Sequence, residues 1–138
     1  MIRKTLLLSA LIGLALPIAC DSDDDDDMGT GAGTGDSDGV PADFAGKTNP
    51  LDGDSGAIAS GMAQYTQLCA NCHGDTGAGD GPGSTTTPPA TDFTAMSNAD
   101  DFMLWSITEG VSGTAMASYS GMSETEIWQL ISYIRTLQ

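Results

Sequence analysis

The pentapeptide Cys69-Ala70-Asn71-Cys72-His73 constrains the fold of this chain more than any other feature. Two cysteines separated by two residues and followed directly by a histidine form the attachment motif of covalently bound c-type haem. Each thiol adds to one haem vinyl group as a thioether, and the adjacent imidazole binds the iron as the proximal ligand. The motif therefore predicts a domain built around one covalent haem that Cys69, Cys72 and His73 hold.

Other uses of this motif fit the chain poorly. His73 is the only histidine, which excludes bis-histidine ligation, a second haem of this type and an ordinary multi-histidine metal centre. A thioredoxin-like CxxC needs a βαβ context, and the sequence contains no alternating strand pattern. A zinc site would need a second cysteine pair.

The N-terminus has the pattern of an export signal. Arg3 and Lys4 form a basic start, and residues 6–18 are an apolar stretch too short to remain as a helix across a bilayer. We therefore predict a signal peptide over residues 1–19.

Cys20 resembles the cysteine of a bacterial lipoprotein signal, which becomes the lipidated N-terminus of the mature protein. Pro17 stands where that pattern usually has Leu, so cleavage by the ordinary signal peptidase, giving a soluble protein, stays an alternative. The chain has three cysteines, and assigning one to lipid and two to haem leaves none unpaired in an oxidising compartment. These features predict a periplasmic protein of the bacterial cell envelope that is anchored to a membrane through Cys20.

Residues 20–55 are rich in Asp, Gly and Thr and include a run of five aspartates, Asp23–Asp27. Apolar side chains are too few there to offset the entropy lost on ordering the segment. We predict a disordered tether over residues 20–55 and a folded domain over residues 56–138.

The net charge of −15 excludes nucleic acid as a partner, because no positive surface is present to meet phosphates. Once the signal peptide is removed, Lys47 and Arg135 are the remaining basic residues. We predict a monomer whose redox protein partners present a basic patch.

The folded domain is predicted to be all-α, with three main helices. The first runs from Ser55 or Gly56 to Leu68 or Cys69 and has apolar side chains at helical spacing. Gly61 in its middle allows close approach of another backbone. About 80 residues build only a small core, so a haem would supply the missing apolar mass.

The second helix is predicted over residues 98–109, with Ser97 or Asn98 as N-cap and Gly110 as its end. The third begins at the capping box Ser123–Glu126. It continues as a single apolar stripe, formed by Ile127, Leu130, Ile131, Ile134 and Leu137.

Residues 56–138 resemble a class I monohaem c-type cytochrome of the short bacterial type. In that family a helix leads into CxxCH, a Gly/Pro loop follows, a methionine loop supplies the sixth iron ligand, and the last helix crosses the first. The segment from Glu109 to Met116 resembles this methionine loop, although Ala117 stands where the family often has Pro. The resemblance implies one haem c with Met116 as its distal ligand, and Met96 is the competing methionine.

The resemblance also implies roles for Pro82 and Trp105. The Pro82 carbonyl would accept a hydrogen bond from the second ring nitrogen of His73 and fix the ring. Trp105 would line the haem pocket or donate to a propionate, with simple core packing as the alternative.

The predicted function is electron transfer rather than catalysis. With His73 and Met116 both bound to iron, no coordination site is open, and methionine ligation raises the reduction potential, as suits a carrier in a respiratory chain. Two alternatives remain: a cytochrome subunit of a larger oxidoreductase, and a haem enzyme or gas sensor in which Met116 is displaced.

Overall fold

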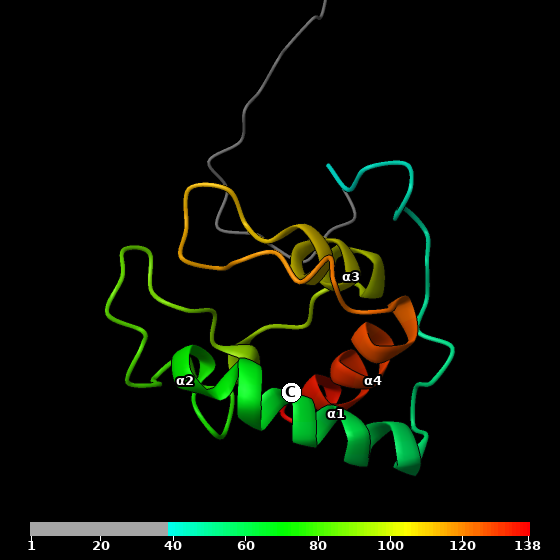
Figure 1. The fold of residues 1–138 in the computed structure, drawn as a ribbon, viewed down its shortest axis with the longest axis horizontal. Helices are drawn as coiled ribbons and strands as arrows, with labels where there is room; N and C mark the ends of the chain where they lie inside the picture. Colours follow the sequence, from blue (N-terminus) through cyan, green and yellow to red (C-terminus); the bar gives the residue numbers. More distant parts are fainter. Residues whose placement is uncertain (1–38) are drawn as a thin grey trace, which may run out of the picture. The chain divides into compact units, whose positions relative to one another are not determined.

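The structure is a computed structural model that describes residues 39–138. The predicted signal peptide, Cys20 and the aspartate run lie outside these residues. The described part contains helices and turns but no strand, which confirms the all-α fold class (Figure 1). Its helices are α1 (Ser55–Leu68), α2 (Ala70–His73), a short 3-10 helix η1 (Phe93–Ala95), α3 (Asp100–Glu109) and α4 (Glu124–Arg135). None of the helices in residues 39–138 is long and apolar enough to cross a membrane.

Helices α1 and α4 cross in direct contact at Gly61. A Cβ atom at this position would collide with the backbone carbonyl of Gln129, so a larger residue would force the two helices apart. Beside the crossing, the rings of Tyr65 and Tyr133 pack with centroids 5.2 Å apart. The Tyr65 hydroxyl is buried and donates to the Gly74 carbonyl over 2.8 Å, which ties α1 to the residue after α2. The crossing of the first and last helices is therefore confirmed.

Helix α4 provides the clearest link between sequence and packing. The hydroxyl of Ser123 accepts from the Glu126 amide, and the Glu126 carboxylate accepts from the Ser123 amide over 2.8 Å, so the predicted capping box is present. The buried core combines side chains of α1, the attachment motif, α3 and α4, namely Tyr65, Cys69, Ala70, Met103, Leu104, Ile107, Ile127, Trp128, Leu130, Ile131 and Ile134. Full burial of one such side chain contributes about 1.5–3 kcal/mol.

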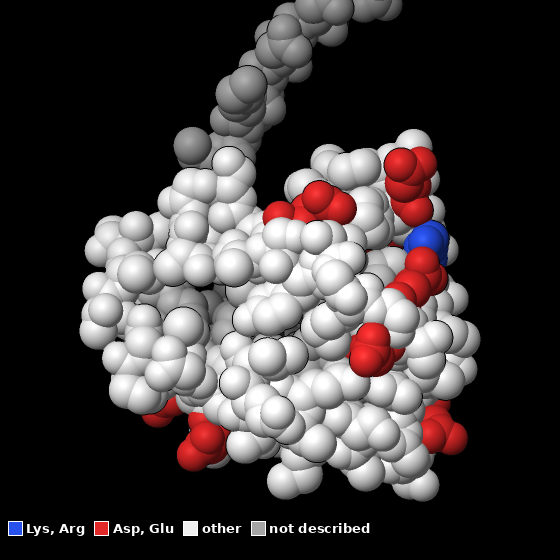
Figure 2. Space-filling model, viewed as in Figure 1, with Lys and Arg blue, Asp and Glu red and all other residues white. Residues whose placement is uncertain are grey.

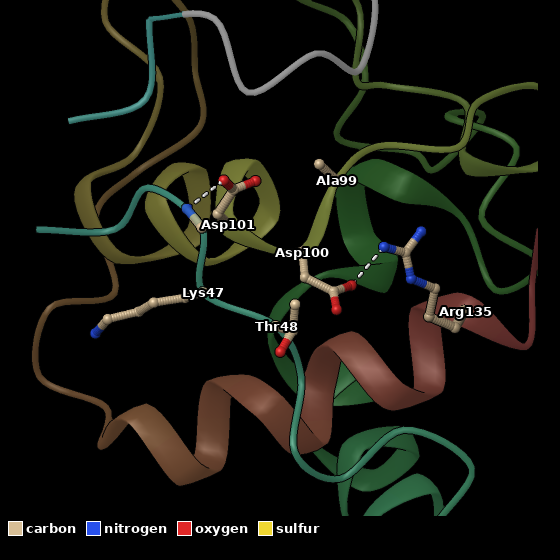
Figure 3. A pocket seen from close by; sticks show the side chains of 7 residues that line it. Lys47, Thr48, Ala99, Asp100, Asp101 and Arg135 are labelled. Carbon is tan, nitrogen blue, oxygen red and sulfur yellow. Dashed lines mark hydrogen bonds and ion pairs between the residues drawn. The ribbon is translucent and has the colours of Figure 1, made fainter. Parts of the chain in front are cut away.

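Helix α3 begins at Asp100, later than the sequence predicted. Its N-cap is Ala99, which has no side-chain hydrogen bond to offer, so the prediction of Ser97 or Asn98 as the cap was wrong. The two aspartates of the first turn bind backbone amides of an earlier segment instead. Asp101 accepts from Gly46 over 2.8 Å (Figure 3). Asp100 accepts from Asn49 over 2.8 Å. Tertiary contacts thus define the start of this helix.

Residues 44–54, here named the strap, pack on the helices rather than belonging to a disordered tether. Asn49 is buried. Its side-chain nitrogen Nδ2 donates to the Trp128 carbonyl over 3.2 Å and to the Ser132 hydroxyl over 2.9 Å. Phe44 and Leu51 pack against the core of the helices. The strap corrects the predicted boundary, because ordered packing begins by Phe44 and not at residue 56.

Candidate haem site

The attachment motif lies where α1 turns into α2. Cys69 ends α1 and precedes α2, and its carbonyl accepts from the amides of Cys72 over 3.0 Å and of His73 over 2.9 Å. Positions three and four residues apart share one face of a helical turn, so this turn gathers the two sulfurs and the imidazole. Both thiols are free, with Cys69 buried and Cys72 partly exposed. Burial raises the pKa of Cys69 to about 11, and the neighbouring Cys72 adds to this shift.

The His73 ring is oriented for metal binding. Its Nδ1 lies 3.0 Å from the Thr91 carbonyl, and because a carbonyl only accepts, Nδ1 carries the hydrogen. Nε2 is then left unprotonated and available to bind a metal. The Phe93 ring stacks on the imidazole with centroids 4.5 Å apart and an angle of 16° between planes. Burial lowers the pKa of His73, with the Thr91 bond opposing part of that shift, so the neutral form that binds metals is favoured.

Pro82 does not make the contact predicted for it, because the carbonyl at the His73 ring belongs to Thr91. The amides flanking Pro82 are held by the attachment motif: Gly81 donates to the Cys72 carbonyl over 3.2 Å and Gly83 to the Asn71 carbonyl over 2.7 Å. These bonds keep Pro82 beside the cysteines, and the loop returns to the imidazole only at Thr91.

Met116 and Trp105 line the same hollow, of about 360 Å³. Met116 is carried by a tight loop that starts at Gly110, whose positive φ of 74° suits glycine. The loop is closed by a hydrogen bond from the Val111 amide to the Met116 carbonyl over 3.1 Å. Met96, the competing methionine, directly follows η1. The hollow is lined neither by Met96 nor by Cys69, Cys72 or His73 of the attachment motif.

Three residues of the site escaped the sequence analysis: Thr91, Phe93 and Tyr119. The Tyr119 hydroxyl donates to the Leu68 carbonyl over 3.1 Å, which joins the methionine loop to the end of α1. Burial raises the pKa of Tyr119, and the two cysteines of the motif raise it further, as expected for a phenol close to both sulfurs. An aromatic residue three positions after Met116 was the available sequence signal; Thr91 acts through its backbone and leaves none.

The donor set fits a c-type haem. Two free thiols, one imidazole with an available Nε2 and one thioether side chain are the groups that covalent attachment and axial ligation require. Within residues 39–138, no cluster of three or more His, Cys, Asp and Glu side chains suits another metal ion.

Solved structures that are similar to this chain include the following two. One is a chain of the reducing HAO-like protein complex of Kuenenia stuttgartiensis, with 30% identity and a TM-score of 0.56 over 64% of this chain and 46% of that one. The other is cytochrome CL of the marine methylotroph Methylophaga aminisulfidivorans, with 23% identity and a TM-score of 0.49 over 64% of this chain and 58% of that one. The chain thus spans about half the length of these solved chains. No curated protein matches it.

A protein-family comparison covers more than half of the chain. Residues 56–134 match the family described as cytochrome c oxidase, cbb3-type, subunit III. This range contains the attachment motif, the methionine loop and nearly all of α4. The chain therefore belongs to this family, as a class I monohaem c-type cytochrome that carries covalent haem c and transfers electrons.

Proposed function

We propose that the chain is an electron carrier in which His73 and Met116 occupy both axial positions of the haem iron. The hydrogen bond between His73 Nδ1 and the Thr91 carbonyl carries this proposal, because it leaves Nε2 as the ring nitrogen for iron. The placement of Met116 at a hollow shared with Trp105 supports it. When bound, the haem supplies one-electron chemistry through its ferric and ferrous states.

The protein groups have separate tasks in this proposal. Cys69 and Cys72 hold the haem covalently, Thr91 keeps the proton on Nδ1, and Phe93 restricts rotation of the imidazole. Trp105 lines the hollow together with Met116. With both axial positions taken by protein side chains, the domain offers no coordination site for a substrate, so it acts as a carrier and not as an enzyme.

Visible absorption spectra of the wild type and of Met116→Ala test the ligation. We expect the ferric wild type to show the weak far-red methionine–iron band and the ferrous wild type to leave carbon monoxide unbound. Met116→Ala should lose the band and bind carbon monoxide, whereas the matched control Met96→Ala should behave as wild type. Loss of the band in Met96→Ala, or carbon monoxide binding by the wild type, contradicts the proposal; the latter favours a gas sensor or haem enzyme.

A second candidate is a cytochrome subunit of a larger oxidoreductase. The family description names an oxidase subunit, and one similar solved chain comes from a multiprotein complex. Purification of the full chain from its native membranes, followed by native mass spectrometry, distinguishes the two. A single chain with one haem supports the free carrier, and a stable complex with other redox subunits supports the second candidate.

We further propose that the N-terminal signal exports the chain and that Cys20 is lipidated, which would place the domain on the outer side of a bacterial membrane. Domains of this cytochrome family are typically extracytoplasmic, which supports export. Mass spectrometry of the mature protein should show a lipid increment that disappears in Cys20→Ser, with the haem increment kept in both. A mature wild-type chain that begins after Cys20 contradicts the lipid anchor.

A further inference from the structure

The methionine loop is held by helix α3 on both sides of Met116. It begins where α3 ends, and the chain returns to the last turn of α3 two residues after Met116. There the Ser118 hydroxyl donates to the Thr108 carbonyl over 2.7 Å, and the Tyr119 amide donates to the Ile107 carbonyl over 3.0 Å. Both hydrogen bonds tie the loop to α3 and not to the attachment motif.

The side chain of Tyr119 links this loop to the attachment side of the domain. Its hydroxyl donates to the carbonyl of Leu68 over 3.1 Å, and Leu68 is the last residue of α1, directly before Cys69. The half-buried Tyr119 ring packs against the core. Helix α4 packs on both α1 and α3, which connects the two sides indirectly, whereas the Tyr119 hydrogen bond joins them directly.

The carbonyl of Leu68 lacks the partner that a continuing helix would provide. In an α-helix the Cys72 amide would donate to it, because each amide binds the carbonyl four residues earlier. Here the Cys72 amide donates to the Cys69 carbonyl over 3.0 Å instead. Carbonyls at a helix end are satisfied by side chains or water, and Tyr119 takes this place at the residue before the first haem cysteine.

Hydrogen bonds and packing, rather than ion pairs, hold this part of the chain. Residues 110–123 contain no Asp, Glu, Lys or Arg, and the area where the loop leaves α3 in Figure 1 is mostly white in Figure 2. Burial raises the pKa of Tyr119, and the neighbouring Cys69 and Cys72 raise it further. The hydroxyl therefore keeps its hydrogen at neutral pH and remains a donor.

We propose that Tyr119 is a positioning residue whose hydroxyl holds the methionine loop at the end of α1 and thereby sets how readily Met116 leaves the haem iron. This inference rests on the proposed ligation by Met116. When Met116 leaves, the loop has to move away from the attachment side while α3 still holds it, so the hydrogen bond to Leu68 breaks. The net contribution of one hydrogen bond corresponds to a shift of about twofold to tenfold in that equilibrium.

Titration of the ferric full chain with imidazole tests the inference. Imidazole displaces Met116, and the loss of the far-red methionine–iron band measures this displacement. The apparent affinity for imidazole scales with the fraction of protein in which Met116 has left the iron. Tyr119→Phe keeps the ring and removes the hydroxyl, so its apparent affinity should rise about twofold to tenfold. Its far-red band without imidazole should remain, because Met116 is still the bound ligand.

Tyr133→Phe is the matched control. It removes the same hydroxyl from a half-buried tyrosine whose ring packs on Tyr65, and it should keep the wild-type affinity for imidazole. An unchanged affinity in Tyr119→Phe, or an equal rise in both variants, overturns the inference. So does a purely structural effect, in which Tyr119→Phe has a lower thermal midpoint but the wild-type affinity.

Failure of the proposed ligation is seen separately. If the wild type itself lacks the far-red band, Met116 is not the ligand, and the inference falls together with the ligation. If the wild type shows the band and Tyr119→Phe binds imidazole as the wild type does, the ligation stands and the inference alone is overturned.

Discussion

The carbonyl of Thr91 lies 3.0 Å from Nδ1 of His73, eighteen residues away in the sequence. The Phe93 ring, two positions further on, stacks against the same imidazole. One short segment therefore fixes both the tautomer and the orientation of the His73 ring. The loop of residues 74–90 connects the attachment motif to this segment.

Removal of the Phe93 ring should make the His73 ring less firmly held and the domain less stable. We expect Phe93→Ala to lower the free energy of unfolding by about 1–3 kcal/mol, because a half-buried aromatic ring and its stacking on His73 are both lost. Phe93→Tyr keeps the ring and should remain within about 0.5 kcal/mol of wild type. Chemical denaturation of the holoprotein measures both, and equal stability of Phe93→Ala and Phe93→Tyr would contradict a role for the stack.

Close approach of α1 and α4 should make Gly61 intolerant of any side chain. A Cβ there would meet the Gln129 carbonyl, a backbone atom that cannot move without shifting α4. We expect Gly61→Ala to destabilise the holoprotein by about 1–3 kcal/mol through overpacking, even though alanine favours helices. Gly121→Ala, whose Cβ would meet nothing within 4 Å, is the control and should change the thermal midpoint little.

Sequence patterns predicted α1 and α4 well because their signals are local. The Ser123–Glu126 capping box and the apolar stripe of α4 act within a few residues, and Gly61 stands out in an otherwise helical segment. The start of α3 was predicted wrongly because its aspartates bind amides of the strap, more than 50 residues away. Such a contact has no local signature.

The candidate site likewise contains some residues that the sequence could predict and others that it could not. The attachment motif has a fixed spacing, so Cys69, Cys72 and His73 could be read from the sequence, and the structure gathers them on one turn. His73 donates its ring hydrogen bond to a backbone carbonyl, which every residue has, so the path of the loop alone decides between Pro82 and Thr91. The assignment of Met116 as a ligand stays a prediction that the spectra described above can test.

Asn49 should hold the strap on the domain. Its side chain joins the strap to α4 through Trp128 and Ser132, and its backbone amide binds Asp100. Asn49→Ala would leave the buried partners of the side chain unsatisfied, with an expected cost of about 1–3 kcal/mol. Asp52→Ala, at an exposed position of the same strap, should cost less than about 0.5 kcal/mol in the same denaturation experiment. Equal costs would argue against an anchoring role for Asn49.

The capping box should make α4 sensitive to acid. Hydrogen bonds from the Ser123 amide and hydroxyl hold the pKa of Glu126 below its ordinary value, and the bond from Lys47 does the same for Glu124. A depressed carboxyl pKa contributes stability above the unfolded value of about 4.3, and this contribution is lost as the pH falls through the folded pKa.

The thermal midpoint of the wild type should therefore fall as the pH is lowered from about 5 towards 3, across the unfolded carboxyl pKa. In Ser123→Ala the hydroxyl bond to Glu126 is absent, so the midpoint should start lower and fall by less over the same interval. Thr125→Ala changes an exposed hydroxyl in the same helical turn and should follow the wild-type curve. A parallel fall in Ser123→Ala and wild type would show that the acid sensitivity of the domain arises from other carboxylates than the one in the capping box.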